Sequence, residues 1–93
     1  MRVTVLGCGT SGGVPRIGNV WGACDPSEPR NRRRRSSILV QSAATTLIVD
    51  TTPDMRDQCL SIDLQRLDAA IYTHGHSDHV NGIDDLRGFT QLQ

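Results

Sequence analysis

The stretch Thr73-His74-Gly75-His76-Ser77-Asp78-His79 places three histidines and one aspartate close together, and the chain has no other histidine. Neutral imidazole nitrogens and carboxylate oxygens are ligands that Zn²⁺, Mn²⁺ and Fe²⁺ accept. Side-chain packing gives no reason to gather every histidine of a chain in one segment. The segment therefore predicts a metal site.

The spacing within this segment has a physical logic. His74 and His76 are two residues apart, so at an extended strand end they point to the same side and can share one metal ion. Asp78 and His79 follow after small residues that let the backbone turn, and they would point toward a second ion. The alternative is a histidine-rich surface loop that binds nothing, and the structural context decides between the two.

The context favours a site. Residues 67–73 form a short, mostly apolar run that is typical of a buried strand ending at His74. After the motif, apolar residues recur at spacings near three, which predicts one face of an amphipathic helix with Ser77 or Asp78 at its cap. These residues are Val80, Ile83, Leu86 and Phe89. The motif thus falls on a strand-to-helix loop, where α/β sheets hold their ligands.

The remainder of the chain predicts an α/β fold. Three further strands are expected, at residues 2–6, 37–40 and 46–50. An irregular stretch rich in glycine and proline fills residues 7–35. Residues 53–61 predict a helix with Thr52 at its cap and Pro53 at its first position. Its buried face would hold Met55, Cys59 and Ile62.

The histidine motif resembles the His-x-His-x-Asp-His signature of the metallo-β-lactamase-fold hydrolases. Three upstream segments resemble one branch of that superfamily, in order: Val5–Pro15, Pro29–Ser37 and Leu47–Thr51. That branch contains the phosphoribosyl 1,2-cyclic phosphate phosphodiesterases and lies close to the tRNA 3′-processing endonucleases. The resemblance implies that residues 1–93 are the N-terminal half of a metallo-β-lactamase αββα sandwich.

The resemblance also implies a chemistry. Two divalent metal ions, Zn or Mn, would hold a hydroxide that attacks a small, cyclic phosphodiester. His74 and His76 would bind the first ion, and Asp78 and His79 the second, with Asp78 also orienting the hydroxide as a catalytic residue. Asp50, at the end of a strand, would support the metal loop by accepting a free histidine N–H; its plainer interpretation is a strand end or a helix cap.

In the resembling family, further histidines and an aspartate complete both metal shells. No histidine follows His79, so we expect a truncated N-terminal part whose second half is absent. Two alternatives to a phosphodiesterase stay open. One is a nuclease similar to the tRNA 3′-processing endonucleases, and the other is a metal-binding fragment without catalytic activity.

Glycines and arginines mark the long irregular stretch. The pattern Gly7-x-Gly9-x-x-Gly12 follows a strand, but a dinucleotide site requires a helix next, and the glycines and proline that follow oppose one. Either a loop that approaches the metal or a substrate phosphate, or a plain turn region, fits better. Five arginines lie within residues 30–35. Arg30 and Arg32 are candidate phosphate contacts, although such runs are often solvated surface.

Composition limits the partners. Ten arginines balance ten acidic residues, so the net charge does not favour nucleic acid. We expect a small phosphodiester substrate, a homodimer and no membrane partner, because no apolar run approaches the roughly 20 residues of a span. Three cysteines without a Cys-x-x-Cys pair, and no recognisable signal, fit the cytoplasm. Cys24 stands alone where some relatives carry a zinc-binding cysteine trio, so no structural zinc is expected there.

Overall fold

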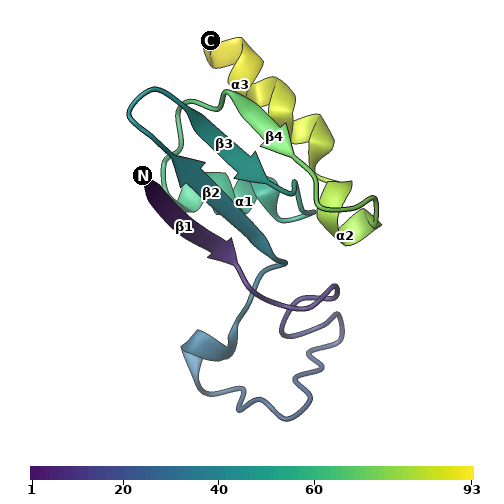
Figure 1. Cartoon of the computed structure of the whole chain (residues 1–93). Helices are drawn as coiled ribbons and strands as arrows, with labels where there is room; N and C mark the ends of the chain where they lie inside the picture. The colour runs from purple at the N-terminus through teal and green to yellow at the C-terminus, as the bar shows by residue number, and fades with distance from the viewer.

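A four-stranded sheet with strand order β1-β2-β3-β4 organises the chain in the computed structural model, which describes residues 1–93 (Figure 1). The strands are β1 (Arg2–Gly7), β2 (Ser37–Gln41), β3 (Thr46–Val49) and β4 (Ala69–Ile71). β1, β2 and β3 pair antiparallel, and β4 pairs parallel to β3. The helices are η1 (Pro29–Asn31), α1 (Met55–Ser61), α2 (Ser77–Val80), η2 (Ile83–Leu86) and α3 (Arg87–Leu92), where η marks a 3₁₀ turn.

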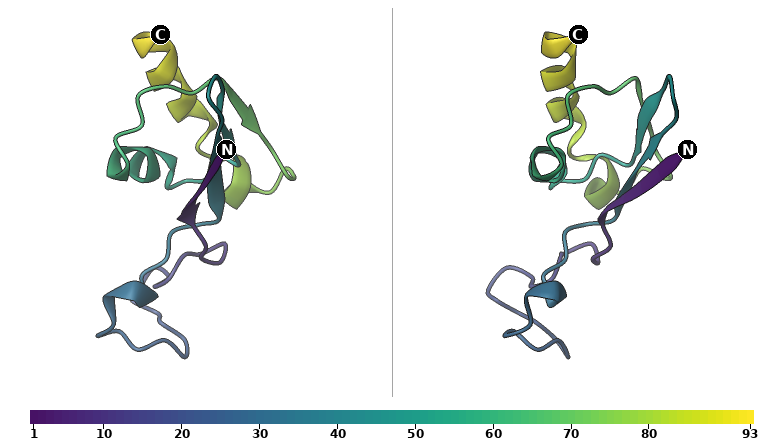
Figure 2. Two further views of the ribbon diagram at one scale, coloured as in Figure 1. Left: turned by 60° about the vertical axis from the view of Figure 1, so that its left-hand side comes forward. Right: turned by 90° about the vertical axis from the view of Figure 1, so that its left-hand side faces the viewer.

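The register assigns the strand residues to two faces. Leu39 pairs with Ile48, and Ile48 pairs with Ala70, so these side chains share one face. Figure 2 shows the helices on that side of the sheet. The core lies between the sheet and the helices and consists of Leu6, Leu39, Ile48, Met55, Cys59, Leu67 and Phe89.

The opposite face of the sheet is apolar and has no helix over it (Figure 2). Cross-strand partners place the following side chains on this open face: Val3, Val5, Ile38, Val40, Leu47, Val49, Ala69 and Ile71. Val5 is 64% exposed and Ile71 is 50% exposed. Strands that are apolar on both faces are typical of sheets covered on both sides.

Between β1 and β2 the chain leaves the sheet as a long arm, residues 8–36, which projects away from the helices and then returns (Figures 1 and 2). At its base, Gly9 N–H donates to Arg34 O at 2.7 Å. A Cβ at Gly7 would overlap the carbonyl oxygen of Arg35. Glycine at position 7 therefore permits the close approach of the two ends of the arm.

The structure confirms the three predicted strands upstream of the motif, each to within one residue, and the irregular stretch between the first two. α1 begins two residues later than predicted, at Met55, because Pro53 and Asp54 form a turn in which Asp54 N–H donates to Thr52 Oγ1. Thr52 thus caps this turn instead of the helix. Met55 and Cys59 are buried as predicted, but Ile62 is 40% exposed, and Gln58 takes its place in the interior.

Two predictions about the C-terminal third are wrong. β4 is only three residues long and largely exposed, because it is an edge strand with one uncovered face. The expected single helix is three short pieces, α2, η2 and α3, separated near Gly82 and Arg87. The cap of α2 is His76, without a side-chain bond, instead of Ser77 or Asp78. Of the predicted apolar face only Phe89 is buried, and Ile83 is 52% exposed.

No helix in the structure combines the length and the apolar character needed to cross a membrane.

Candidate metal centre

The histidine segment lies on the loop between β4 and α2 and on α2 itself (Figure 1). The rings of His74 and His76 have centroids 4.6 Å apart, and those of His74 and His79 lie 4.1 Å apart. His74 and His76 are exposed, whereas Asp78 and His79 are half-buried. The structure therefore brings the three imidazoles together in one cluster at the surface.

Asp50 lies beneath this cluster, directly after β3. Its side chain is buried, and its backbone has a positive φ of 68°. Oδ1 accepts the Thr73 N–H at 2.8 Å, and Oδ2 lies 2.7 Å from His79 Nδ1. Burial by itself would raise the pKa of Asp50, but the bonds from the Thr73 N–H, from His79 and from the Thr73 hydroxyl outweigh it and hold the pKa below its ordinary value.

The charge on Asp50 decides the tautomer of His79. A carboxylate only accepts hydrogen bonds, so Nδ1 of His79 must donate to it. The lone pair of Nε2 is then free to bind a cation. This arrangement is the one in which a buried carboxylate orients a ligating histidine.

Thr73 extends the same arrangement to His74. The Thr73 hydroxyl donates to Asp50 Oδ2 at 2.8 Å, and its oxygen lies 2.9 Å from His74 Nδ1. Because the hydroxyl proton is already directed at the carboxylate, Nδ1 of His74 donates to the hydroxyl oxygen. His74 is left with an unprotonated Nε2. One carboxylate thereby sets the tautomers of two imidazoles.

Asp78 and His79 converge on one point. Nε2 of His79 lies 3.1 Å from Asp78 Oδ2. In the neutral tautomer both atoms are acceptors, so a cation between them would interact favourably with both. Two ligands of one Zn²⁺, each about 2.0–2.2 Å from the ion, are roughly 3–3.5 Å apart. The separation of this pair fits a shared cation.

The cluster offers donor pairs and not a closed cage. No group of three or more His, Cys, Asp or Glu side chains has its donor atoms gathered around one point. The donor types nevertheless suit a divalent transition metal, because two imidazoles with fixed tautomers and one carboxylate lie within residues 74–79.

Contacts of Thr51, which follows β3, fasten the end of α2 to the sheet. Thr51, fully buried, lies 2.9 Å from Tyr72 Oη through its hydroxyl and also donates to Val80 O at 3.3 Å. Gly82 N–H donates to Thr51 O at 2.8 Å, and a Cβ at Gly82 would overlap Thr52 O. The two elements that carry Asp50 and His79 are thus held at a fixed separation.

The two candidate phosphate contacts lie on the arm and not within the histidine cluster. Arg30 is bound to Glu28, with Nε 2.8 Å from Oε1. Arg32 lies over the ring of Trp21, with its guanidinium carbon 5.1 Å from the ring centroid. Cys24 is an exposed free thiol on the same arm.

Sequence reasoning did not identify Thr73 or Trp21 as functional candidates. The signal for Thr73 was present, since a hydroxyl next to a candidate ligand can bond to its ring. The contact between Trp21 and Arg32 joins residues eleven positions apart in an irregular segment and leaves no periodic signal.

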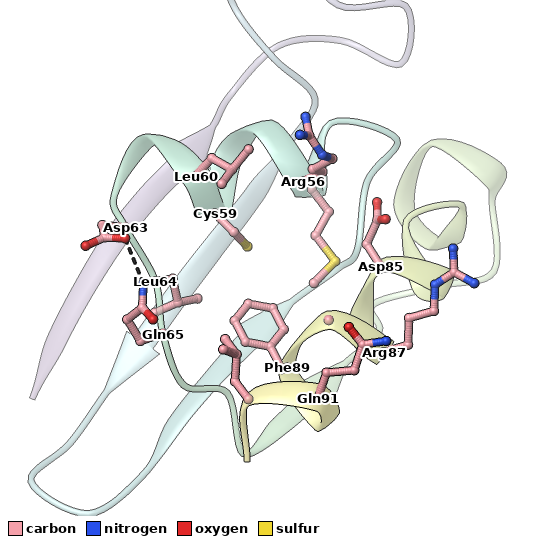
Figure 3. A pocket seen from close by; sticks show the side chains of 13 residues that line it. Arg56, Cys59, Leu60, Asp63, Leu64, Gln65, Asp85, Arg87, Phe89 and Gln91 are labelled. Carbon is pink, nitrogen blue, oxygen red and sulfur yellow. Dashed lines mark hydrogen bonds between the residues drawn. The ribbon is translucent and has the colours of Figure 1, made fainter.

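A hollow of about 430 Å³ between α1 and α3 lies apart from the histidines (Figure 3). Cys59, Leu64 and Phe89 line it together with the charged residues Asp85 and Arg87. None of the candidate site residues borders it. Burial raises the pKa of the Cys59 thiol there, and the negative charge of Asp85 adds to the effect.

The sequence profile of the metallo-beta-lactamase superfamily matches residues 30–92. The chain belongs to the metallo-beta-lactamase superfamily. Its mixed sheet corresponds to the N-terminal part of that fold. A crystal structure of a diphosphatase from the PhnP family superimposes with a TM-score of 0.86 at 48% identity over 94% of this chain. Zn²⁺-bound PqqB from Methylobacterium extorquens gives 0.75 at 28% identity over 94% of the chain.

Two curated relatives share the same segment. A protein named octanoyltransferase from Porphyromonas gingivalis (strain ATCC BAA-308 / W83) is 42% identical over 88 residues, which are 94% of this chain and 18% of that protein. A ribonuclease Z from Bradyrhizobium sp. (strain ORS 278) is 37% identical over 69 residues, or 72% of this chain and 23% of that protein. The chain likewise spans 34% of each of the two solved structures. Metallo-beta-lactamase-fold proteins similar to this chain are thus several times longer.

Proposed function

We propose that the protein is a metal-dependent hydrolase of the phosphodiesterase type, or the N-terminal part of one. The observation that carries the proposal is the convergence of His79 Nε2 and Asp78 Oδ2 at 3.1 Å, with Nδ1 of the same imidazole held by the buried Asp50. The lone pair of Nε2 and the carboxylate oxygen are both electron donors, and a divalent cation between them would bind to both.

His74, His76, Asp78 and His79 are the residues that would hold two divalent cations, Zn or Mn. Bound cations of this kind supply Lewis acidity toward water and toward phosphoryl oxygens. The protein's own contribution is orientation. Asp50 and Thr73 hold the Nδ1 protons of His79 and His74, so that the Nε2 lone pair of each neutral ring is available to a cation, and Asp78, half-buried beside His79, presents a carboxylate that can accept a proton from an attacking water.

A phosphorus-centred substrate is supported by the names of two similar proteins. The diphosphatase of the PhnP family is 48% identical to this chain, and the ribonuclease Z is 37% identical. Zinc is supported by the Zn²⁺-bound PqqB, whose fold is shared. We favour a small, cyclic phosphodiester as substrate. The three free cysteines support a cytoplasmic location.

A nuclease acting on tRNA 3′ ends is the second candidate function. The similarity to ribonuclease Z favours it. The third candidate is a metal-binding fragment without activity, which the open donor pairs favour.

Metal content and hydrolysis, measured together, test the proposal. The protein, loaded with Zn²⁺ or Mn²⁺ and dialysed, is expected to retain metal and to cleave bis(p-nitrophenyl) phosphate. His76→Ala and Asp78→Asn should each lose bound metal and activity. Asp84→Asn, an exposed carboxylate on η2, is the matched control and should retain both.

The outcomes separate the candidates. Metal retention without turnover of bis(p-nitrophenyl) phosphate or of a tRNA precursor supports the inactive fragment. Turnover of the tRNA precursor alone supports the nuclease. A protein that retains no metal, or whose metal content is the same in Asp78→Asn and in the wild type, contradicts the proposal.

A further inference from the structure

Charge is unevenly distributed although the net charge is zero. The arm, residues 8–36, carries six arginines and only two acidic residues, whereas the rest of the chain carries four arginines and eight acidic residues. The arm projects from the body of the molecule (Figure 1), so the projection is positively charged and the body negatively charged. Such separation attracts anions to one part of a molecule.

A hollow of about 410 Å³ lies where the arm meets β1. Residues 5–8 form one side of it, and Arg30, Arg32, Arg33 and Arg34 line the other. Pockets that take small ligands fall in the range of roughly 300–1,000 Å³. The hollow is thus large enough for a small molecule, and its charged lining residues are all arginine.

Two of the four arginines already have carboxylate partners. Arg30 pairs with Glu28 at 2.8 Å, and Arg34 lies 3.4 Å from Asp57. Arg32 and Arg33 have no carboxylate within 4.0 Å. The hollow therefore carries two uncompensated positive charges, which match the charge of one phosphate dianion.

The two unpaired arginines are held in place by weak partners. Arg32 rests on the face of Trp21, 5.1 Å from its centroid, and Arg33 Nη1 donates to Cys8 Sγ at 2.9 Å. The backbone of Arg33 is fixed by two bonds with Val14, of 2.8 and 2.9 Å. A thiol is a poor acceptor, so its donor can be redirected to a phosphate oxygen at little cost. The guanidiniums are thus oriented before a ligand arrives, which lowers the entropy lost on binding.

We infer that this arginine hollow binds a phosphate group of a small phosphorylated molecule, at a site distinct from the histidine cluster. Guanidinium groups match phosphate oxygens in geometry and charge. A nucleic-acid strand would need a continuous basic track with several stacking platforms, and the arm offers a single tryptophan whose face Arg32 occupies.

The arginine hollow adjoins a second hollow of about 290 Å³, lined in part by Gly7, Cys8, Ser36 and Asp50. Gly7 and Cys8 border both hollows. A bound phosphate would thus lie on the side of the molecule that leads to the residue supporting the metal loop. The inference rests on the proposed function only for the statement that the phosphorylated molecule is the substrate; phosphate binding itself requires no metal.

Tryptophan fluorescence provides the test, because Trp21 is the only tryptophan and contacts Arg32. Metal-free protein is titrated with glycerol 3-phosphate and, separately, with a single-stranded oligoribonucleotide. Glycerol 3-phosphate is expected to bind saturably, and Arg32→Gln/Arg33→Gln should raise its Kd about tenfold or more, through lost charge-assisted bonds. Arg2→Gln/Arg87→Gln removes the same net charge outside the hollow and should change Kd less than about twofold, since surface charges are screened.

Each other outcome contradicts the inference. An equal rise in Kd for both double variants would show that the effect comes from net charge alone. Binding of the oligoribonucleotide without binding of glycerol 3-phosphate would show that the arm contacts nucleic acid. A thermal melt of each variant checks that both fold. His76→Ala should leave glycerol 3-phosphate binding unchanged. Phosphate binding without metal binding therefore overturns the proposed function alone, and metal binding without phosphate binding overturns this inference alone.

Discussion

Asp50 adopts a left-handed backbone with φ of 68°, which costs a non-glycine residue of order 1–3 kcal/mol. The conformation persists because the surroundings fix it: Asp50 N–H donates to Ile71 O at 2.8 Å, and Ser37 Oγ donates to Asp50 O at 3.0 Å. The result is a buried carboxylate aimed at the loop after β4. Residues under such constraint concentrate at functional sites, where the strain positions a reactive group.

Thr73→Val tests the relay from Asp50 to His74. Valine keeps the shape of threonine but removes the hydroxyl between the carboxylate and the ring. We expect zinc affinity to fall about 10–100-fold, the usual effect of losing a group that orients a ligand. Competition with a chromophoric chelator measures the affinity, and ¹⁵N shifts of the His74 ring report the tautomer.

Thr73→Ser retains the hydroxyl and should restore both the affinity and the tautomer. If Thr73→Val leaves the His74 ring shifts unchanged, the hydroxyl does not set the tautomer and the relay is wrong.

At the scale of elements, the close contact between Gly82 and α1 sets the position of α2. A Cβ at Gly82 would meet Thr52 O and Met55 Cβ, both fixed parts of the interior. Gly82→Ala is expected to lower the free energy of unfolding by about 1–3 kcal/mol, because a packed interior cannot absorb the added atom. Urea denaturation followed by circular dichroism measures the change.

Gly88→Ala is the matched control for this prediction. A Cβ at Gly88 would have nothing within 4 Å, and the residue lies in α3. Alanine there should be neutral or stabilise by up to about 1 kcal/mol, since it favours helix more than glycine does. Equal destabilisation by both substitutions would show that the contact at Gly82 is not special.

The elements predicted from the sequence are those that local patterns encode. The first three strands follow from runs bounded by turns, and the strand-to-helix position of the histidines follows from the apolar run at 67–73. The prediction of a single final helix was wrong because the helical segment is interrupted at Gly82, whose N–H bonds to Thr51 O instead of to a helical carbonyl. Periodicity also could not show that β4 is half uncovered, since exposure depends on which other layer is present.

The site was predicted in part for the same reason. A local motif identified the histidines, and the family resemblance pointed to Asp50. The bond from Asp50 to His79 joins residues 29 positions apart and could not be derived from spacing. The charge pairing of the arginines was equally hidden, because Arg34 and Arg35 find their partners, Asp57 and Asp54, on and beside α1.

At the scale of the whole molecule, the open sheet face is the main apolar surface that no other layer covers. Its eight side chains are all apolar, and an αββα sandwich packs a second sheet against such a face. Where residues 1–93 are produced alone, this face is left to water or to a second copy. Exposed apolar patches of this kind drive association, and we therefore propose that residues 1–93, produced alone, pair through the open face as a homodimer.

Val3→Lys tests the pairing, because Val3 lies on the open face, is 54% exposed and contributes nothing to the core. Each apolar side chain buried in a dimer contributes about 1.5–3 kcal/mol, so its replacement by lysine should raise the dimer dissociation constant tenfold or more. Sedimentation velocity over a range of protein concentrations measures it. Ile17→Lys, at a position 98% exposed on the arm, adds the same charge and should leave the constant unchanged. A wild-type protein that stays monomeric at high concentration would refute the dimer, and an equal effect of Ile17→Lys would move the contact from the sheet to the arm.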